Sequence, residues 1–169
     1  MAIATLVLTV LGRDKPGLVE QLAETLAAHN ANWLESALSR LAGQFAGVLR
    51  VEVTAERRAA LEGALAALTD LTVSVVEGGA EPEFTYEFTL SVSAHDRVGI
   101  VKEVSQVLAR HGVNVEQLST EVASAAMSSE SMFYADAVLR APAGFDADAL
   151  QRDLEALSDD LFVEIGQDE

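Results

Sequence analysis

The chain has 169 residues, of which 50% are hydrophobic and 22% are charged, and it contains no cysteine. This composition excludes a disordered chain, a collagen-like chain and a disulfide scaffold, and it leaves no thiol for catalysis or metal binding. The formal net charge of -16 disfavours direct binding to nucleic acid, because a phosphate backbone is bound mainly through Lys and Arg.

The first apolar stretch, residues 2–11, is too short to span a bilayer. No basic residue precedes it, and it runs into Arg13, Asp14 and Lys15 instead of a small-residue cleavage site. We therefore expect a cytoplasmic protein that does not bind membranes.

Hydrophobic periodicity predicts the elements of the first half of the chain. Apolar and β-branched residues predict a strand over 5–11, and Leu18, Leu22 and Leu26 recur at helical spacing and predict the next helix. A hairpin of strands 33–41 and 45–53, a helix over 55–68 and a strand over 72–76 follow. Residues 77–83 have no periodicity and contain Gly and Pro, so they are predicted to be a linker.

The second half repeats this order, with strands over 85–93, 113–122, 132–139 and 161–165. Helices are predicted from residue 100 to about 110 and over 146–157. The chain also aligns with itself at an offset of 82, which places Asp14 over Asp96, Gly17 over Gly99, and Asn32 over Asn114. These matches predict two βαββαβ units, with a first domain over 1–79 and a second over 80–169.

The turn before the first helix of each unit has two interpretations. In the structural one, Asp14 and Asp96 cap the helix, Pro16 occupies the first helical turn, and Gly17 and Gly99 allow a tight bend. In the functional one, free N–H groups of that turn bind the carboxylate of an amino acid and the Asp binds its ammonium group. Asn32 and Asn114, where the next strand begins, offer a donor and an acceptor to such a ligand.

Catalytic and metal sites are not predicted. His95 and Asp96 resemble half of a catalytic relay, but the sequence has no recognisable nucleophile to go with them. His29 and His111 fall at matched helix ends, where each ring can bind a terminal carbonyl, and the three His are not spaced as zinc ligands. We expect no cofactor.

Two further features leave alternatives open. RNA-recognition modules share the βαββαβ order, but the middle strands here lack their aromatic residues and basic surroundings. The small-residue segment 123–131 is an insertion in the second unit, and it is either a mobile loop or a lid over a ligand.

The repeat, the Asp-x-x-Gly turns and the paired Asn residues resemble tandem ACT-domain proteins over almost the whole chain. Residues 39–47 resemble, more narrowly, the family of glycine cleavage system transcriptional repressors. The resemblance implies an α+β fold of two tandem ferredoxin-like βαββαβ ACT domains with antiparallel sheets. It also implies a small amino acid, glycine or serine, as ligand where the first helix of a unit starts and where units adjoin. The implied ligand-binding residues are Asp14, Pro16, Gly17, Leu18, Asn32, Asp96, Val98, Gly99, Ile100 and Asn114. Val98 departs from the Pro-Gly pattern of the family's turn.

The partner implied by the resemblance is a LysR-type transcription activator of the glycine cleavage operon, so that repression works through protein contact. Residues 81–169 hold 5 Lys+Arg against 18 Asp+Glu, which suits docking on a basic protein surface but is equally explained by solubility. The alternative is an allosteric regulatory subunit of an amino-acid metabolic enzyme. Exposed edge strands allow pairing within the chain or in a homodimer.

Overall fold

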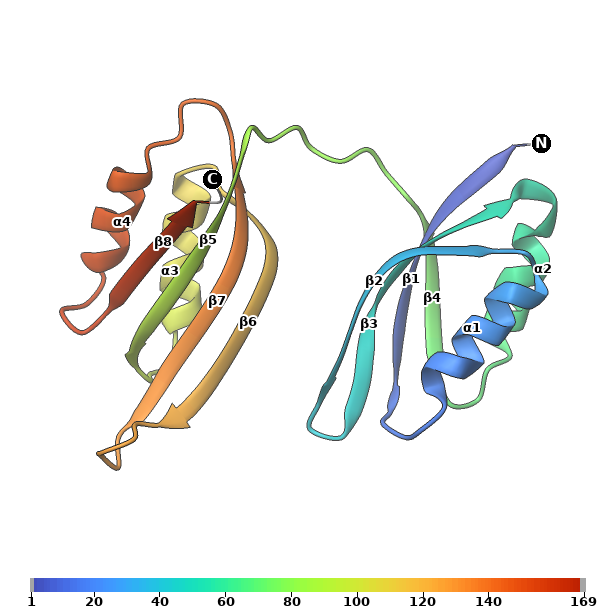
Figure 1. Cartoon of the computed structure of the whole chain (residues 1–169), viewed down its shortest axis with the longest axis horizontal. Helices are drawn as coiled ribbons and strands as arrows, with labels where there is room; N and C mark the ends of the chain where they lie inside the picture. The colour runs from blue at the N-terminus through green and yellow to red at the C-terminus, as the bar shows by residue number, and fades with distance from the viewer. Residues whose placement is uncertain (1, 168–169) are drawn as a thin grey trace. The chain divides into compact units, whose positions relative to one another are not determined.

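A computed structural model describes residues 2–167 of the chain, so the outermost residues of the two predicted domains, 1 and 168–169, lie outside the described residues. Its elements follow the predicted order, each within a few residues of the expected bounds (Figure 1). The first half contains β1 (Ile3–Arg13), α1 (Leu18–Ala28), β2 (Asn32–Leu41), β3 (Gln44–Thr54), α2 (Ala55–Ala66) and β4 (Thr72–Glu77). The second contains β5 (Tyr86–His95), α3 (Ile100–Arg110), β6 (Asn114–Ser124), β7 (Ser131–Ala141), α4 (Ala147–Glu155) and β8 (Phe162–Gln167).

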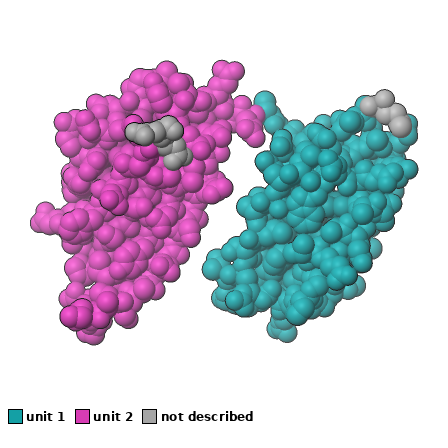
Figure 2. Space-filling view, in the orientation of Figure 1, with its two compact units in different colours: residues 1–80 teal, residues 81–169 magenta. Residues whose placement is uncertain are grey.

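The chain forms two compact units, residues 1–80 and 81–169, joined by a segment over 78–85 that is neither helix nor strand (Figure 2). Each unit has one four-stranded antiparallel sheet, in the order β2-β3-β1-β4 in unit 1 and β6-β7-β5-β8 in unit 2. In each unit both helices lie on the same face of the sheet (Figure 1). The predicted α+β βαββαβ fold is therefore confirmed.

The register of the sheets supports the internal alignment residue by residue. Leu6 of β1 pairs with Val51 of β3, and Phe88 of β5, which is 82 residues later than Leu6, pairs with Leu139 of β7. Val51 and Leu139 also correspond in the sequence, because the second half has about six additional residues before Leu139, so the two halves share their strand register. The additional residues of the second half lie in the β6–β7 connection, residues 125–130.

Each unit has its own hydrophobic core between its helices and its sheet. In unit 1, Leu18, Leu22 and Leu26 form the buried stripe of α1, as their spacing predicts, and pack with residues of β1, β3 and α2. In unit 2, Ile100, Val107 and Leu108 are the buried residues of α3. No polar or charged side chain of residues 2–167 is buried, so the cores are apolar throughout.

Left-handed backbone conformations occur where the sequence predicts the ends of helices and turns. Asn30 ends α1 with φ 50° and Gly112 ends α3 with φ 68°. The β2–β3 hairpin turns through Ala42 and Gly43, with φ 49° and 76°, the positive values that suit the twist of two strands. Within residues 2–167, no helix combines the length and hydropathy needed to cross a membrane.

Candidate functional site

The turn that connects β1 to α1 contains the candidate ligand residues of unit 1. Gly17 precedes the helix with φ 92°, and a Cβ there would meet no other atom within 4 Å. The positive φ is therefore the feature that favours glycine at this position. Pro16 lies before Gly17, outside the first helical turn in which the sequence places it. Gly99 repeats the geometry before α3, with φ 90°.

The expected Asp caps are not present in the structure. No side chain caps α1 or α3, and Asp14 lies 3.6 Å from the Arg40 Nε instead. The structural interpretation of the Asp residues as caps is wrong, because Gly17 and Gly99 occupy the N-cap positions, which places each Asp three residues before its helix cap. The N–H groups of the first turns therefore have no side-chain acceptor, whereas α4 is capped by Asp146, which accepts from the Ala149 N–H at 3.1 Å.

Backbone hydrogen bonds attach both Asp residues to the neighbouring hairpin. The Asp14 N–H donates to the Gly43 carbonyl at 2.9 Å, and the Asp96 N–H donates to the Ser131 carbonyl at 2.9 Å. Each turn thus rests against the end of the hairpin of its own unit. This fixes the direction in which the turn leaves the sheet.

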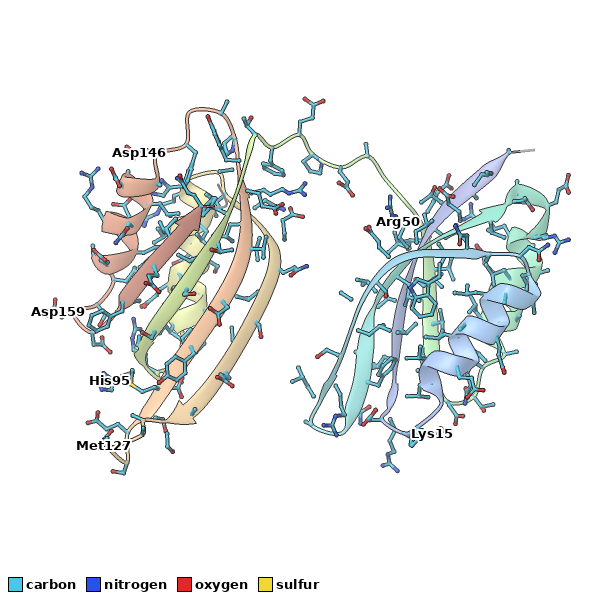
Figure 3. The ribbon with its side chains drawn as sticks, in the orientation of Figure 1. Lys15, Arg50, His95, Met127, Asp146 and Asp159 are labelled. Carbon is cyan, nitrogen blue, oxygen red and sulfur yellow. The ribbon has the colours of Figure 1, made fainter. Side chains whose placement is uncertain are left out.

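A second carboxylate, which the sequence reasoning did not identify, anchors the turn of unit 1. Asp70 accepts from the Lys15 Nζ at 2.7 Å and from the Gln21 Nε2 at 2.9 Å (Figure 3 labels Lys15). The Lys15 ammonium, and then the Gln21 amide, lower the pKa of Asp70. Gly12 allows this approach, because a Cβ there would lie 2.3 Å from the Asp70 carbonyl oxygen.

Asp160 takes the corresponding position in unit 2 and binds His95. One Asp160 oxygen is 2.8 Å from the His95 backbone nitrogen and 2.7 Å from its Nδ1. The other ring nitrogen, Nε2, is 2.9 Å from Glu130, in the segment that the sequence identifies as an insertion. Glu130 and then Asp160 raise the pKa of His95, and hydrogen bonds from Ser158 and from His95 lower the pKa of Asp160. Figure 3 shows His95 and Met127 at this end of unit 2.

The two Asn residues lie far from these turns. Asn32 begins β2 and pairs with Glu52, which pairs in turn with Thr5 of β1, nine positions before Asp14. At about 3.3 Å per strand residue, Asn32 and Asp14 lie roughly 30 Å apart. Asn114 is placed in the same way in unit 2, where it bonds to the Glu116 carboxylate at 2.6 Å. The structure therefore does not bring Asp and Asn of one unit together.

The remaining candidate residues differ in exposure. Pro16 and Gly17 are exposed and Val98 is fully exposed, whereas Leu18 and Ile100 are 2% and 3% exposed and belong to the cores. At Leu18 and Ile100 only the backbone can meet a ligand.

The predicted carbonyl contact is present for His29 and absent for His111. The His29 Nδ1 donates to the Thr25 carbonyl at 2.9 Å, as expected for a helix end. The His111 Nε2 lies 2.7 Å from Asp153 of α4 instead, so the expected carbonyl contact was wrong there, because α4 brings a carboxylate within reach. Among residues 2–167, no three His, Asp or Glu side chains are placed to hold a metal ion.

Comparison with known proteins gives matches over both units. Two family models described as ACT domain match residues 4–76 and 88–137. An unknown protein from Galdieria sulphuraria is 25% identical, with TM-score 0.84 over 99% of this chain and 100% of that chain. A candidate glycine cleavage system transcriptional repressor is 18% identical, with TM-score 0.75 over 99% of this chain and 100% of that chain. At this identity, the likeness shows a shared fold. No curated protein matches the chain by sequence.

Proposed function

Because the chain belongs to the ACT-domain family and carries two such domains in tandem, we propose that it is a cytoplasmic, non-catalytic regulator that responds to glycine or serine. The observation that supports a ligand site most directly is the pair of β–α turns. Both turns place uncapped N–H groups at the start of an 11-residue helix, beside an Asp that caps nothing. The N–H groups would bind the ligand carboxylate and the Asp its ammonium group.

The positions of the Asn residues give this proposal a geometric requirement. A small amino acid cannot reach from Asp14 to Asn32 across roughly 30 Å of one unit. If both residues bind it, they come from two ACT units, for example units of two copies of the chain in a homodimer. Ligand binding would then stabilise one association state, and the shift is limited by the difference in its affinity for the two states.

The regulatory output that we propose is repression of the glycine cleavage operon through contact with a LysR-type transcription activator. The shared fold of the candidate repressor and the resemblance of residues 39–47 to that family support this reading. The charge supports contact with a protein and not with DNA, because residues 81–169 hold 18 Asp+Glu against 5 Lys+Arg.

Thermal unfolding with a panel of amino acids at millimolar concentration tests the sensing step. A ligand at about 100 times its dissociation constant adds roughly 2.7 kcal/mol to the free energy of unfolding, and glycine or serine should give this shift selectively. A flat response to every amino acid would contradict sensing.

Affinity purification with and without glycine tests the output. Recovery of a LysR-type regulator supports the proposal. Recovery of a metabolic enzyme instead supports the alternative, an allosteric subunit.

A further inference from the structure

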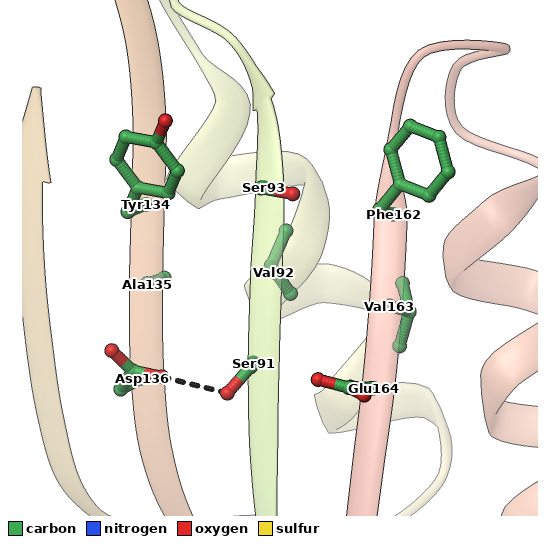
Figure 4. Close-up of a pocket in the computed structure, with 9 residues that line it drawn as sticks. All are labelled: Ser91, Val92, Ser93, Tyr134, Ala135, Asp136, Phe162, Val163 and Glu164. Carbon is green, nitrogen blue, oxygen red and sulfur yellow. Dashed lines mark hydrogen bonds between the residues drawn. The ribbon is translucent and has the colours of Figure 1, made fainter. Parts of the chain in front are cut away.

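Unit 2 has a hollow of about 440 Å³ on the face of its sheet that no helix of the unit covers (Figure 4). Three neighbouring strands line it, with β5 in the middle and β7 and β8 on either side. The shape follows from side-chain length, because the two residues of β5 that face it are serines and those beside them are larger. The hollow has the size of a site for one small molecule.

Strand register arranges the lining residues in two rows across the sheet. In one row, Ser91 lies between Asp136 of β7 and Glu164 of β8. In the next row, Ser93 lies between Tyr134 and Phe162 (Figure 4). Two carboxylates therefore flank the floor at one end of the hollow, and two aromatic rings flank it at the other.

The two carboxylates have no cationic partner in the part of the chain that the structure describes. Within residues 2–167, neither Asp136 nor Glu164 forms a salt bridge with Lys, Arg or His. Asp136 accepts one hydrogen bond, from the Ser91 Oγ at 2.6 Å, which orients it toward the middle strand. Arg140, four residues further along β7, pairs with Glu87 at 3.0 Å. An uncompensated pair of negative charges on one row favours a cation between them.

The fold itself does not require these residues, as unit 1 shows. At the corresponding positions of its sheet, Thr9 lies between Val48 and Ser74, and Leu11 lies between Ala46 and Thr72. Unit 1 therefore has the same strands and register without a carboxylate or an aromatic ring on these rows. The charge and the rings are an addition of unit 2.

We propose that this hollow binds a small organic cation that carries a guanidinium group on an alkyl chain. Strands lie about 4.8 Å apart, so the backbones of Asp136 and Glu164 are separated by roughly 10 Å, and a guanidinium above Ser91 reaches both carboxylates. Its five N–H donors lie in a fixed plane and can serve two acceptors at once. The alkyl chain then lies between Tyr134 and Phe162, one row away, where the two rings give it an apolar contact.

An NMR titration of the full-length, ¹⁵N-labelled chain with butylguanidinium tests this proposal. Butylurea has nearly the same shape without the charge and serves as the matched ligand control. Butylguanidinium has no carboxylate, so it does not compete for the amino-acid site proposed at the turns, and the two proposals can fail separately. We expect saturable shifts confined to the amides of residues 89–93, 134–136 and 162–164, and none of them with butylurea.

Two variants test the residues. The double variant Asp136→Asn/Glu164→Gln removes both charges, keeps an acceptor for Ser91, and should weaken binding at least tenfold. Phe162→Ala, at a side chain that is 73% exposed, should weaken it without affecting folding. Glu155→Gln on α4 is the control: it removes one negative charge on the helix side of unit 2 and should leave binding unchanged.

Shifts that do not saturate, that spread over the acidic surface, or that persist in the double variant would overturn the proposal. Binding of an Ala-Arg-Ala peptide without binding of butylguanidinium would overturn it in favour of a protein partner.

Discussion

Asp70 and Asp160 hold the same position in the two units, each directly before a buried leucine and the last strand, and each binds residues in or beside its unit's β–α turn. The partners differ, because Asp70 binds Lys15 and Gln21, whereas Asp160 binds His95. The anchor of unit 1 contains no histidine. The anchor of unit 2 contains the imidazole of His95, whose protonation changes in that range.

Unit 2 should therefore lose stability as the pH rises from about 6 to 8. The folded state raises the pKa of His95. The contribution of protonated His95 to the free energy of unfolding is therefore fully present below the unfolded pKa of about 6.5, and it is lost as the pH rises through the folded pKa. The thermal midpoint of the wild type should fall over this range. His95→Asn should flatten that dependence, and a dependence equal to that of the wild type would contradict the assignment.

Gly17→Ala and Gly99→Ala should each lower the free energy of unfolding by about 1–2 kcal/mol, because alanine is unfavourable at positive φ. Neither Cβ meets a neighbour, so the backbone conformation alone sets the cost. Gly63→Ala in α2 is the matched control, since its Cβ also meets nothing but its backbone is helical. Gly63→Ala should raise the free energy of unfolding by up to about 1 kcal/mol. Urea denaturation measures all three variants. Equal effects at all three positions would contradict this account.

Asp146→Ala should lower stability by about 1 kcal/mol, because it removes the hydrogen bond that caps α4. Thr54→Ala at the N-cap of α2 removes no side-chain cap bond and should lower stability by less. Urea denaturation of both variants measures the difference. A larger loss for Thr54→Ala than for Asp146→Ala would show that the side-chain cap is not what stabilises α4.

Asp14→Ala and Asp96→Ala should change stability by less than a helix cap does, about 0.5 kcal/mol or less, since neither side chain caps a helix. Their effect is expected on ligand binding instead. Chemical denaturation without ligand measures the change in stability. A loss of about 1 kcal/mol in either variant would indicate a structural role for that Asp.

The fold could be predicted from the sequence because the signals were local and repeated. Leu18, Leu22 and Leu26 have helical spacing, and Asn30 and Gly112 favour the left-handed conformation that ends a helix. The repeat then supported each element with a second copy. The observed register agrees with the alignment of the two halves, since Val51 and Leu139 pair with the equivalent residues Leu6 and Phe88.

The site was harder to predict because its contacts are between distant segments. Glu130 and Asp160 meet His95 from 35 and 65 residues away, and no periodicity encodes those distances. The Asp-Leu pair before each last strand, Asp70-Leu71 and Asp160-Leu161, was the available signal for the missed anchor. The sequence analysis offered Asp14 and Asn32 to one ligand, and their separation was missed although the βαβ order predicts it, because the helix returns the chain to the far end of the sheet.

Calorimetric titration of glycine and of serine into the full-length chain tests the central proposal, amino-acid binding at the β–α turns, most directly. The account predicts saturable binding of at least one of them, weakened tenfold or more by Asp14→Ala or Asp96→Ala and unchanged by Glu155→Gln. Absence of binding to both amino acids, or binding that neither Asp variant weakens, would contradict it.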